Sequence, residues 1–128
     1  MPKSLADFVE AAKRSVAETP PESIEELRGL GWRILDVREP WEYDEGHLPG
    51  AENFPRGFLE VKADLEHYKR DESLADRSQR MVCYCGGGHR SLLACQTLQQ
   101  MGFENVLSLE EGWTGWTERG LPVEMDTD

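Results

Sequence analysis

The sequence is short of positive charge. Its 128 residues contain 14 Lys and Arg against 25 Asp and Glu, which gives a formal net charge of -11 at pH 7. Nucleic-acid backbones are held by clustered Lys and Arg, so this balance argues against a nucleic-acid partner. An acidic protein also repels anionic substrates at long range. Any attraction for an anion must therefore come from a local group of donors.

Long apolar runs are missing as well. No stretch approaches the roughly 20 residues that cross a membrane, and the first residues lack the uninterrupted apolar segment of a signal peptide. With 38% hydrophobic and 30% charged residues, the composition is that of a soluble globular protein, and the length suits one domain. We therefore expect a cytoplasmic protein with no membrane partner, either a monomer or a homodimer.

Cysteine is scarce too. The chain has three, Cys83, Cys85 and Cys95, an odd number with no pair of Cys-x-x-Cys units. Neither a disulfide framework nor a structural zinc site is indicated, and we expect no metal and no cofactor. A reducing compartment suits a cysteine that works as a free thiol.

Residues 81–95 carry the most specific pattern in the chain. A short apolar run ends at Cys85, three glycines follow at once, and the next segment has helical spacing. That spacing is carried by Leu92, Leu93, Cys95, Gln96, Leu98 and Met101. The pattern predicts a strand, a tight loop and a helix, with Cys85 at the hinge.

Such a hinge favours the nucleophilic form of a cysteine. Glycines adopt backbone angles forbidden to other residues, so residues 86–88 allow successive N–H groups to point toward the Cys85 sulfur. The helix adds its free N-terminal N–H groups, and Arg90 adds a positive charge. These groups favour a thiolate, so we predict that Cys85 is a catalytic nucleophile. The alternative is a small buried residue followed by an ordinary turn.

Three blocks of the sequence resemble motifs of the rhodanese-type sulfurtransferases. Residues 85–91, Cys-Gly-Gly-Gly-His-Arg-Ser, are similar to the active-site loop Cys-x-x-Gly-x-Arg-Ser of that family. Residues 36–51 are similar to its first motif, Asp-Val-Arg-x-x-x-Glu-Tyr-x-x-Gly-His-x-x-Gly-Ala. The third block lies at 102–106, 109–113 and 120–123, with Glu111-Gly112 where the family usually has a Gly-Gly pair. Together the blocks cover about 34–123, which is a specific signal.

The resemblance implies a three-layer rhodanese-like α/β domain. Its central sheet would be mainly parallel, with about five strands flanked by helices. The alternation of strands and helices along the chain independently indicates a parallel α/β sheet. We expect this domain at 23–128 and an N-terminal helical extension at 1–22.

The same resemblance implies a sulfurtransferase that works through a persulfide on Cys85. The donor would be a small anionic sulfur compound such as thiosulfate, with mercaptopyruvate as the alternative, and the acceptor a small thiol or a protein. The loop residues expected to bind the donor are Gly86, Gly87, Gly88, His89 and Arg90. Because the first two present no side chains, His89 and Arg90 would supply any selectivity.

The N-terminal segment predicts an amphipathic helix. Ser4 is placed to cap it, and apolar residues fall at helical spacing. They are Leu5, Phe8, Val9, Ala12 and Val16, and the sequence Thr-Pro-Pro at 19–21 is expected to stop the helix. A second, short helix is predicted to begin with a capping box at Ser23 and Glu26. The first helix either packs on the domain or docks a partner or second copy.

Other candidate residues have mainly structural interpretations. Asp36 and Arg38 follow a buried strand, at the sheet edge where ligands collect, yet a hydrogen-bonded scaffold that holds neighbouring loops is favoured. His47 in its glycine-rich turn is expected to be structural, and Trp113 to be core rather than a wall of the site. Cys83 is expected to be a buried strand residue, with a redox partnership with Cys85 as the alternative.

Two other functions compete with sulfur transfer. One is a non-catalytic interaction module or stoichiometric persulfide carrier. The other is a cysteine phosphatase or arsenate reductase, whose cysteine and arginine are separated by five residues. Only four residues separate Cys85 from Arg90, so the loop is expected to be too small for a tetrahedral oxyanion.

Overall fold

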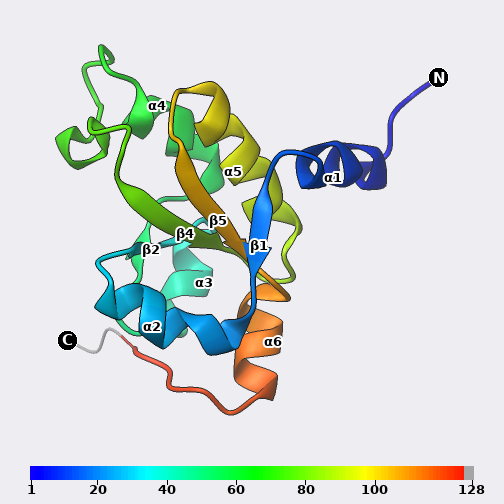
Figure 1. The fold of residues 1–128 in the computed structure, drawn as a ribbon, viewed down its shortest axis with the longest axis vertical. Helices are drawn as coiled ribbons and strands as arrows, with labels where there is room; N and C mark the ends of the chain where they lie inside the picture. Colours follow the sequence, from blue (N-terminus) through cyan, green and yellow to red (C-terminus); the bar gives the residue numbers. More distant parts are fainter. Residues whose placement is uncertain (126–128) are drawn as a thin grey trace.

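The computed structural model describes residues 1–125; residues 126–128, the end of the domain expected at 23–128, lie outside the described part. One five-stranded sheet has the order β1-β5-β4-β2-β3, and each neighbouring pair is parallel (Figure 1). The strands are β1 (Ala17–Thr19), β2 (Arg33–Asp36), β3 (Glu52–Asn53), β4 (Arg80–Tyr84) and β5 (Asn105–Leu109). The predicted α/β class with a parallel central sheet is confirmed.

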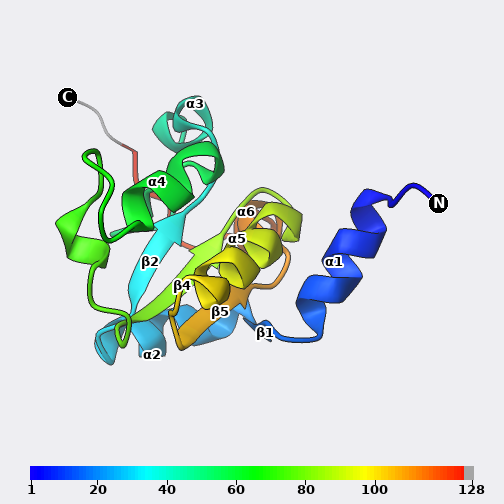
Figure 2. The same cartoon turned by 90° about the horizontal axis from the view of Figure 1, so that it is seen from above.

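Helices cover both faces of the sheet and complete three layers (Figure 2). They are α1 (Leu5–Lys13), α2 (Ile24–Gly29), α3 (Pro40–Asp44), α4 (Leu59–Ala63), α5 (His89–Gln100) and α6 (Gly112–Glu118). Residues of α1, α4 and α5 form one apolar cluster with Leu35 and Cys83 of the sheet. Residues of α2 and α6 form the other cluster with Ile34 and Val82. Neighbouring residues of β2 and β4 belong to different clusters because successive side chains along a strand point to opposite faces of the sheet.

The N-terminal segment adds a strand that the sequence did not reveal. Helix α1 ends at Lys13, well before the expected stop at 19–21, and β1 then pairs with β5 at the edge of the sheet. Val9 and Val16 are buried, whereas Leu5 is 55% and Phe8 50% exposed. The segment thus contributes a strand as well as a packed helix. The boundary expected between residues 22 and 23 stays a prediction.

The two predicted helix starts have different outcomes. At Ser4, the hydroxyl accepts from the Asp7 N–H at 3.2 Å, and the Asp7 carboxylate accepts from the Ser4 N–H at 2.8 Å, so α1 has a capping box. The expected capping box at Ser23 is wrong. Ser23 already has helical backbone angles at the end of a 3-10 turn, and its hydroxyl donates to the Pro20 carbonyl at 2.8 Å.

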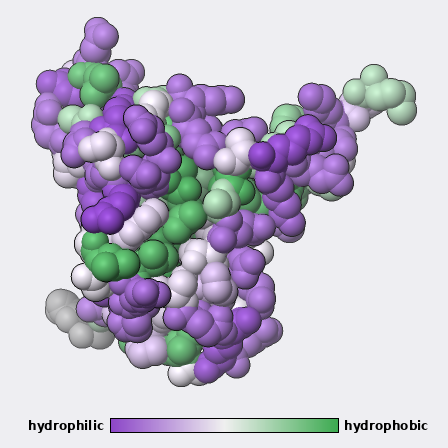
Figure 3. Space-filling view, viewed as in Figure 1, coloured by the Kyte–Doolittle hydropathy of each residue, from purple (hydrophilic) through white to green (hydrophobic). Residues whose placement is uncertain are grey.

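The surface matches the composition. On the face drawn in Figure 3, hydrophilic residues cover most of the molecule, and apolar residues gather in a band across the middle. Within residues 1–125, none of the helices combines the length and the apolar character needed to span a membrane.

Candidate active site

Cys85 lies between β4 and α5, at the carboxyl edge of the sheet. The chain forms the predicted strand, loop and helix, because the apolar run pairs as a central strand and α5 begins at His89. Gly88 precedes the helix with a φ of 105°, a left-handed conformation that favours glycine. This turn brings the first amides of α5 back over the cysteine.

The Cys85 sulfur accepts hydrogen bonds from this turn. The Gly88 N–H donates to Sγ at 3.1 Å and the Ser91 N–H at 3.3 Å, and the thiol contacts the Ser91 hydroxyl at 3.5 Å. Both amides belong to the start of α5, where N–H groups lack helical partners and carry partial positive charge. Although Cys85 is only 1% exposed, its sulfur is therefore held by polar donors that favour a negative charge.

The outer side of the loop is held by α6. The carbonyls of Cys85 and Gly86 accept from the N–H groups of Trp113 at 2.7 Å and Thr114 at 2.9 Å. In a trans peptide the N–H points opposite to the C=O, so the Gly86 and Gly87 amides face away from α6. All three glycines were expected to aim N–H groups at the sulfur. Within residues 1–125, the Gly88 N–H donates to Cys85 Sγ, whereas the Gly86 and Gly87 amides are oriented by the hydrogen bonds from α6.

Gly112 is required for this contact between α6 and the loop. Its φ is 53°, and a Cβ there would collide with the Cys85 carbonyl oxygen and lie 3.0 Å from that of Gly86. The preceding residue, Glu111, has a φ of 61°, a conformation usually left to glycine. In the sequence, this Glu-Gly pair is visible only as a departure from a motif. Its role in holding the loop depends on a contact between distant segments.

Arg90 is paired with an acidic residue of α3. Its guanidinium donates to the Glu42 carboxylate at 2.8 and 3.2 Å. This hydrogen bond lowers the pKa of Glu42 and raises the pKa of Arg90. Arg90 keeps its full charge, but the adjacent Glu42 carboxylate offsets it, so the positive field at the loop is weaker than the sequence suggested. His89, the other residue expected to select the donor, is exposed at the start of α5.

Asp36 and Arg38 lie in a buried hydrogen-bonded cluster. Arg38 Nη2 donates to Asp36 Oδ2 at 2.8 Å and to the Gly46 carbonyl at 2.7 Å. The Tyr84 hydroxyl donates to Asp36 Oδ2 at 2.6 Å and accepts from the Leu48 N–H at 3.1 Å. Burial, with Asp36 beside it, raises the pKa of Tyr84. The cluster ties β2 and β4 to the loop at 46–48.

Two large residues near this cluster, Trp113 and His47, make packing and hydrogen-bond contacts of the kind expected for structural residues. The Trp113 ring lies 4.6 Å from the Arg38 guanidinium and is partly buried. His47 is 1% exposed, stacks on Tyr43 with ring centroids 3.8 Å apart, and contacts the Leu48 carbonyl at 2.9 Å.

Cys83 and Cys95 differ from Cys85 in their surroundings. All three are buried free thiols in the apolar cluster that includes α5, but the Cys85 sulfur accepts hydrogen bonds from the amides at the start of α5. A hydrogen bond to Cys83, together with burial, raises the pKa of Cys95 well above its ordinary value, and its thiol donates to the Leu107 carbonyl at 3.4 Å. These contacts favour the neutral thiol. The alternative of a redox bond between Cys83 and Cys85 stays a prediction.

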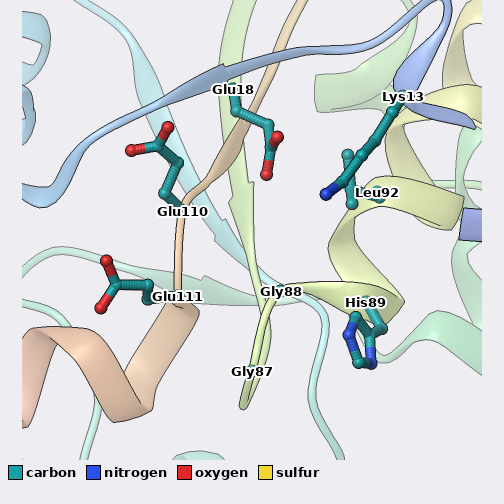
Figure 4. A pocket seen from close by; sticks show the side chains of 8 residues that line it. All are labelled: Lys13, Glu18, Gly87, Gly88, His89, Leu92, Glu110 and Glu111. Carbon is teal, nitrogen blue, oxygen red and sulfur yellow. The ribbon is translucent and has the colours of Figure 1, made fainter. Parts of the chain in front are cut away.

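A cavity of about 380 Å³ opens beside the loop, with Gly87, Gly88 and His89 in its wall (Figure 4). Lys13 of α1 and Glu18 of β1 also line it, although the sequence analysis placed no site in that segment. Nothing local marks those two residues, because they reach the loop only once β1 pairs with β5. In the part of the chain that the structure describes, no group of three or more His, Cys, Asp or Glu is placed to hold a metal ion.

Cys85 follows a central parallel strand, and amides at the start of a helix hold its sulfur. This arrangement is typical of enzymes and carriers that use a thiolate. Comparison with known sequences narrows this class. The rhodanese-like domain family matches residues 19–119, and the chain belongs to that family.

Proteins similar to this chain carry names that describe different functions. Thiosulfate sulfurtransferase 16, chloroplastic, of Arabidopsis thaliana is 33% identical over 96 residues, which cover 73% of this chain and 80% of the relative. The putative sulfur carrier protein YrkF of Bacillus subtilis is 38% identical over 88 residues, covering 66% of this chain but 43% of that protein. A solved structure from Rhodopseudomonas palustris, described as of unknown function and a possible tyrosine phosphatase, has a TM-score of 0.89 and 29% identity. That match covers 97% of this chain and 96% of the other.

Proposed function

We propose that this chain is a sulfurtransferase that moves sulfane sulfur from thiosulfate to a thiophilic acceptor through a persulfide on Cys85. The observation that carries the proposal is the pair of hydrogen bonds from Gly88 and Ser91 to the Cys85 sulfur, at 3.1 and 3.3 Å. Sulfur transfer requires that negative charge is stabilised in two states: on the Cys85 sulfur of the thiolate, and on the outer sulfur of the persulfide. Backbone donors fixed in place stabilise such charge without rearranging.

In the first step, the Cys85 thiolate attacks the outer sulfur of thiosulfate. The sulfur–sulfur bond of the donor breaks, and sulfite leaves with the electron pair. The product is a persulfide with its charge on the outer sulfur. The Gly86 and Gly87 amides, which α6 holds facing away from itself, are the donors proposed to meet that outer sulfur.

In the second step, a thiophilic acceptor takes the outer sulfur and the Cys85 thiolate returns. Because the donor product leaves before the acceptor reacts, the kinetics should be ping-pong. Arg90 is proposed to contribute a positive field near the bound anion, moderated by Glu42. Asp36 and Arg38 are proposed as supporting residues that position the loops around the cysteine. A reducing compartment, the cytoplasm, suits this thiol chemistry.

Labelling Cys85 with sulfur is the direct test. After mixing with thiosulfate, mass spectrometry should find one added sulfur on the peptide that contains Cys85, and sulfite should accumulate when cyanide is the acceptor. Cys85→Ser should abolish both signals. Cys95→Ala is the matched control, because it removes a buried thiol outside the loop and should keep both. Wild-type turnover in Cys85→Ser would sink the proposal.

A stoichiometric persulfide carrier is the second candidate, favoured by the similarity to a protein named as a putative sulfur carrier. A carrier takes up sulfur without repeated turnover. Counting the sulfite released per protein molecule with excess thiosulfate and cyanide separates the two: many equivalents indicate an enzyme, and a single equivalent indicates a carrier.

A phosphatase is disfavoured, although one similar structure is described as a possible tyrosine phosphatase. Four residues separate Cys85 from Arg90, one fewer than in cysteine phosphatases. The Arg90 guanidinium, the group that would bind phosphate oxygens, already donates hydrogen bonds to the Glu42 carboxylate. Hydrolysis of an aryl phosphate that disappears in Cys85→Ala would reverse this ranking.

A further inference from the structure

The cavity lies beside the loop that holds the reacting sulfur. Gly88 lies in the wall of this 380 Å³ space (Figure 4). Its amide nitrogen lies 3.1 Å from Cys85 Sγ. Pockets that bind small molecules start at about this volume, roughly 300 Å³. A small molecule that occupies the cavity therefore lies next to the residue that holds the sulfur.

Opposite charges line the two sides of this cavity. In Figure 4, the Lys13 side chain and His89 lie on one side, and Glu18 and Glu110 lie on the other. The Lys13 ammonium and the Glu18 carboxylate both point into the space between. Three separate segments supply the charged residues: Lys13 ends α1, Glu18 lies in the edge strand β1, and Glu110 follows β5.

Several of these charges have no protein counterion. Among residues 1–125, Lys13, Glu18 and Glu110 make no ion pair, whereas the neighbouring Glu111 is bonded to Arg119 at 3.2 Å. Charged groups on facing walls that are not paired with one another are free to bind a ligand of complementary charges. The cavity thus offers one site for a cation and one for an anion.

We propose that this cavity binds the sulfur acceptor, and that the acceptor is a small thiol carrying both an ammonium and a carboxylate. Its ammonium would face Glu18 and Glu110, and its carboxylate would face Lys13 and His89. The net charge of -11 supports this choice, because the protein repels anions at long range but exerts no net force on a zwitterion. The inference rests on the proposed sulfur transfer and names the substrate of its second step.

The acceptor thiol first gives its proton to the Cys85 persulfide anion. The resulting acceptor thiolate then forms a bond to the outer sulfur of the protonated persulfide. The bond between that sulfur and Cys85 Sγ breaks, and its electron pair returns to Sγ as the thiolate. The proton stays on the transferred sulfur, so the product is the persulfide of the acceptor. No oxidant or reductant is needed.

The test compares four acceptors with saturating thiosulfate: cysteine, cysteamine, 3-mercaptopropionate and 2-mercaptoethanol. They carry both charges, the ammonium alone, the carboxylate alone and neither. Sulfite release gives kcat/KM for each thiol, corrected to the thiolate concentration because the thiolate is the nucleophile. Cysteine should exceed each singly charged thiol by about twofold to fivefold, the size expected for one solvent-exposed ion pair.

Variants assign the two charges. Lys13→Met should remove the preference for cysteine over cysteamine, and Glu18→Gln combined with Glu110→Gln should remove the preference over 3-mercaptopropionate. Each rate is divided by the cyanide rate of the same variant, which corrects for changes in the first step. Lys3→Met and Glu10→Gln, which change the same charges on exposed residues outside the cavity, should keep both preferences.

The outcomes separate the inference from the proposed function. Normal cyanide turnover without a preference for cysteine overturns the inference alone, as does a preference that survives in both cavity variants. A wild-type protein that releases no sulfite with cyanide overturns the proposed function and the inference with it.

Discussion

The Cys85 loop and the buried cluster of Asp36, Arg38 and Tyr84 lie at the same edge of the sheet, but they stabilise charge in opposite ways. In the cluster, a buried carboxylate is neutralised by an arginine and a tyrosine hydroxyl. In the loop, two backbone amides hold the sulfur at 3.1 and 3.3 Å, and the nearby Arg90 is bonded to Glu42. A fixed side-chain pair holds loops in place, whereas amides stabilise whichever sulfur species carries the charge.

Breaking the buried pair should have the largest effect. Arg38→Met leaves the Asp36 carboxylate buried without its counterion, so we expect the free energy of unfolding to fall by about 3–5 kcal/mol. Urea unfolding measures this loss. Arg70→Met is the matched control, because its pair with Glu72 is exposed and should contribute less than about 1 kcal/mol. Equal losses in the two variants would show that the cluster is not a special scaffold.

Disturbing the backbone of the loop should reduce activity more than stability. In Gly112→Ala, the added Cβ collides with the Cys85 carbonyl and displaces the loop amides, so kcat/KM with thiosulfate should fall by about 100-fold, as when an oxyanion donor is lost. Gly29→Ala is the control: nothing lies within 4 Å of its Cβ, and it should keep full activity. Undiminished turnover in Gly112→Ala would contradict the role given to α6.

The pair between Glu42 and Arg90 should have the smallest effect, and the effect should depend on pH. Because Arg90 depresses the pKa of Glu42 in the folded state, the stabilisation is present above the ordinary value of 4.5 and is lost as the pH falls through the depressed pKa. Glu42→Gln should cost about 1 kcal/mol at pH 7. The difference in unfolding free energy between wild type and Glu42→Gln should be smaller at acidic pH than at pH 7. Thermal unfolding at neutral and at acidic pH measures it. A constant difference would show that the charge of Glu42 is not involved.

Local patterns predicted part of the fold and of the site. The cap joins Ser4 to Asp7, three positions later, and the hinge at Cys85 follows from an apolar run, glycines and helical spacing, so both can be recognised within one segment. The alternation of such segments gave the parallel α/β class. The placement of Asp36 and Arg38 at the carboxyl end of a buried strand was visible in the same way.

What the sequence concealed depends on contacts between distant segments. β1 has three residues and no pattern of its own, and it becomes a strand because β5 supplies its hydrogen-bond partners. Glu42 and Arg90 meet across 48 positions of the chain. The bonds from α6 to the Cys85 loop likewise join segments that no local spacing connects. The expected cap at Ser23 failed because the residues before it already form a 3-10 turn.

The position of β1 has a consequence for truncation. A fragment beginning at residue 23 would lose the edge strand and uncover Leu107, Ser108 and Leu109, the residues of β5 that pair with β1; Ser108 and Leu109 are buried in the whole chain. An uncovered apolar strand of this kind invites edge-to-edge aggregation. The short β1, with its exposed Glu18, covers that edge, so we expect a fragment without the first 22 residues to self-associate more readily than the whole chain.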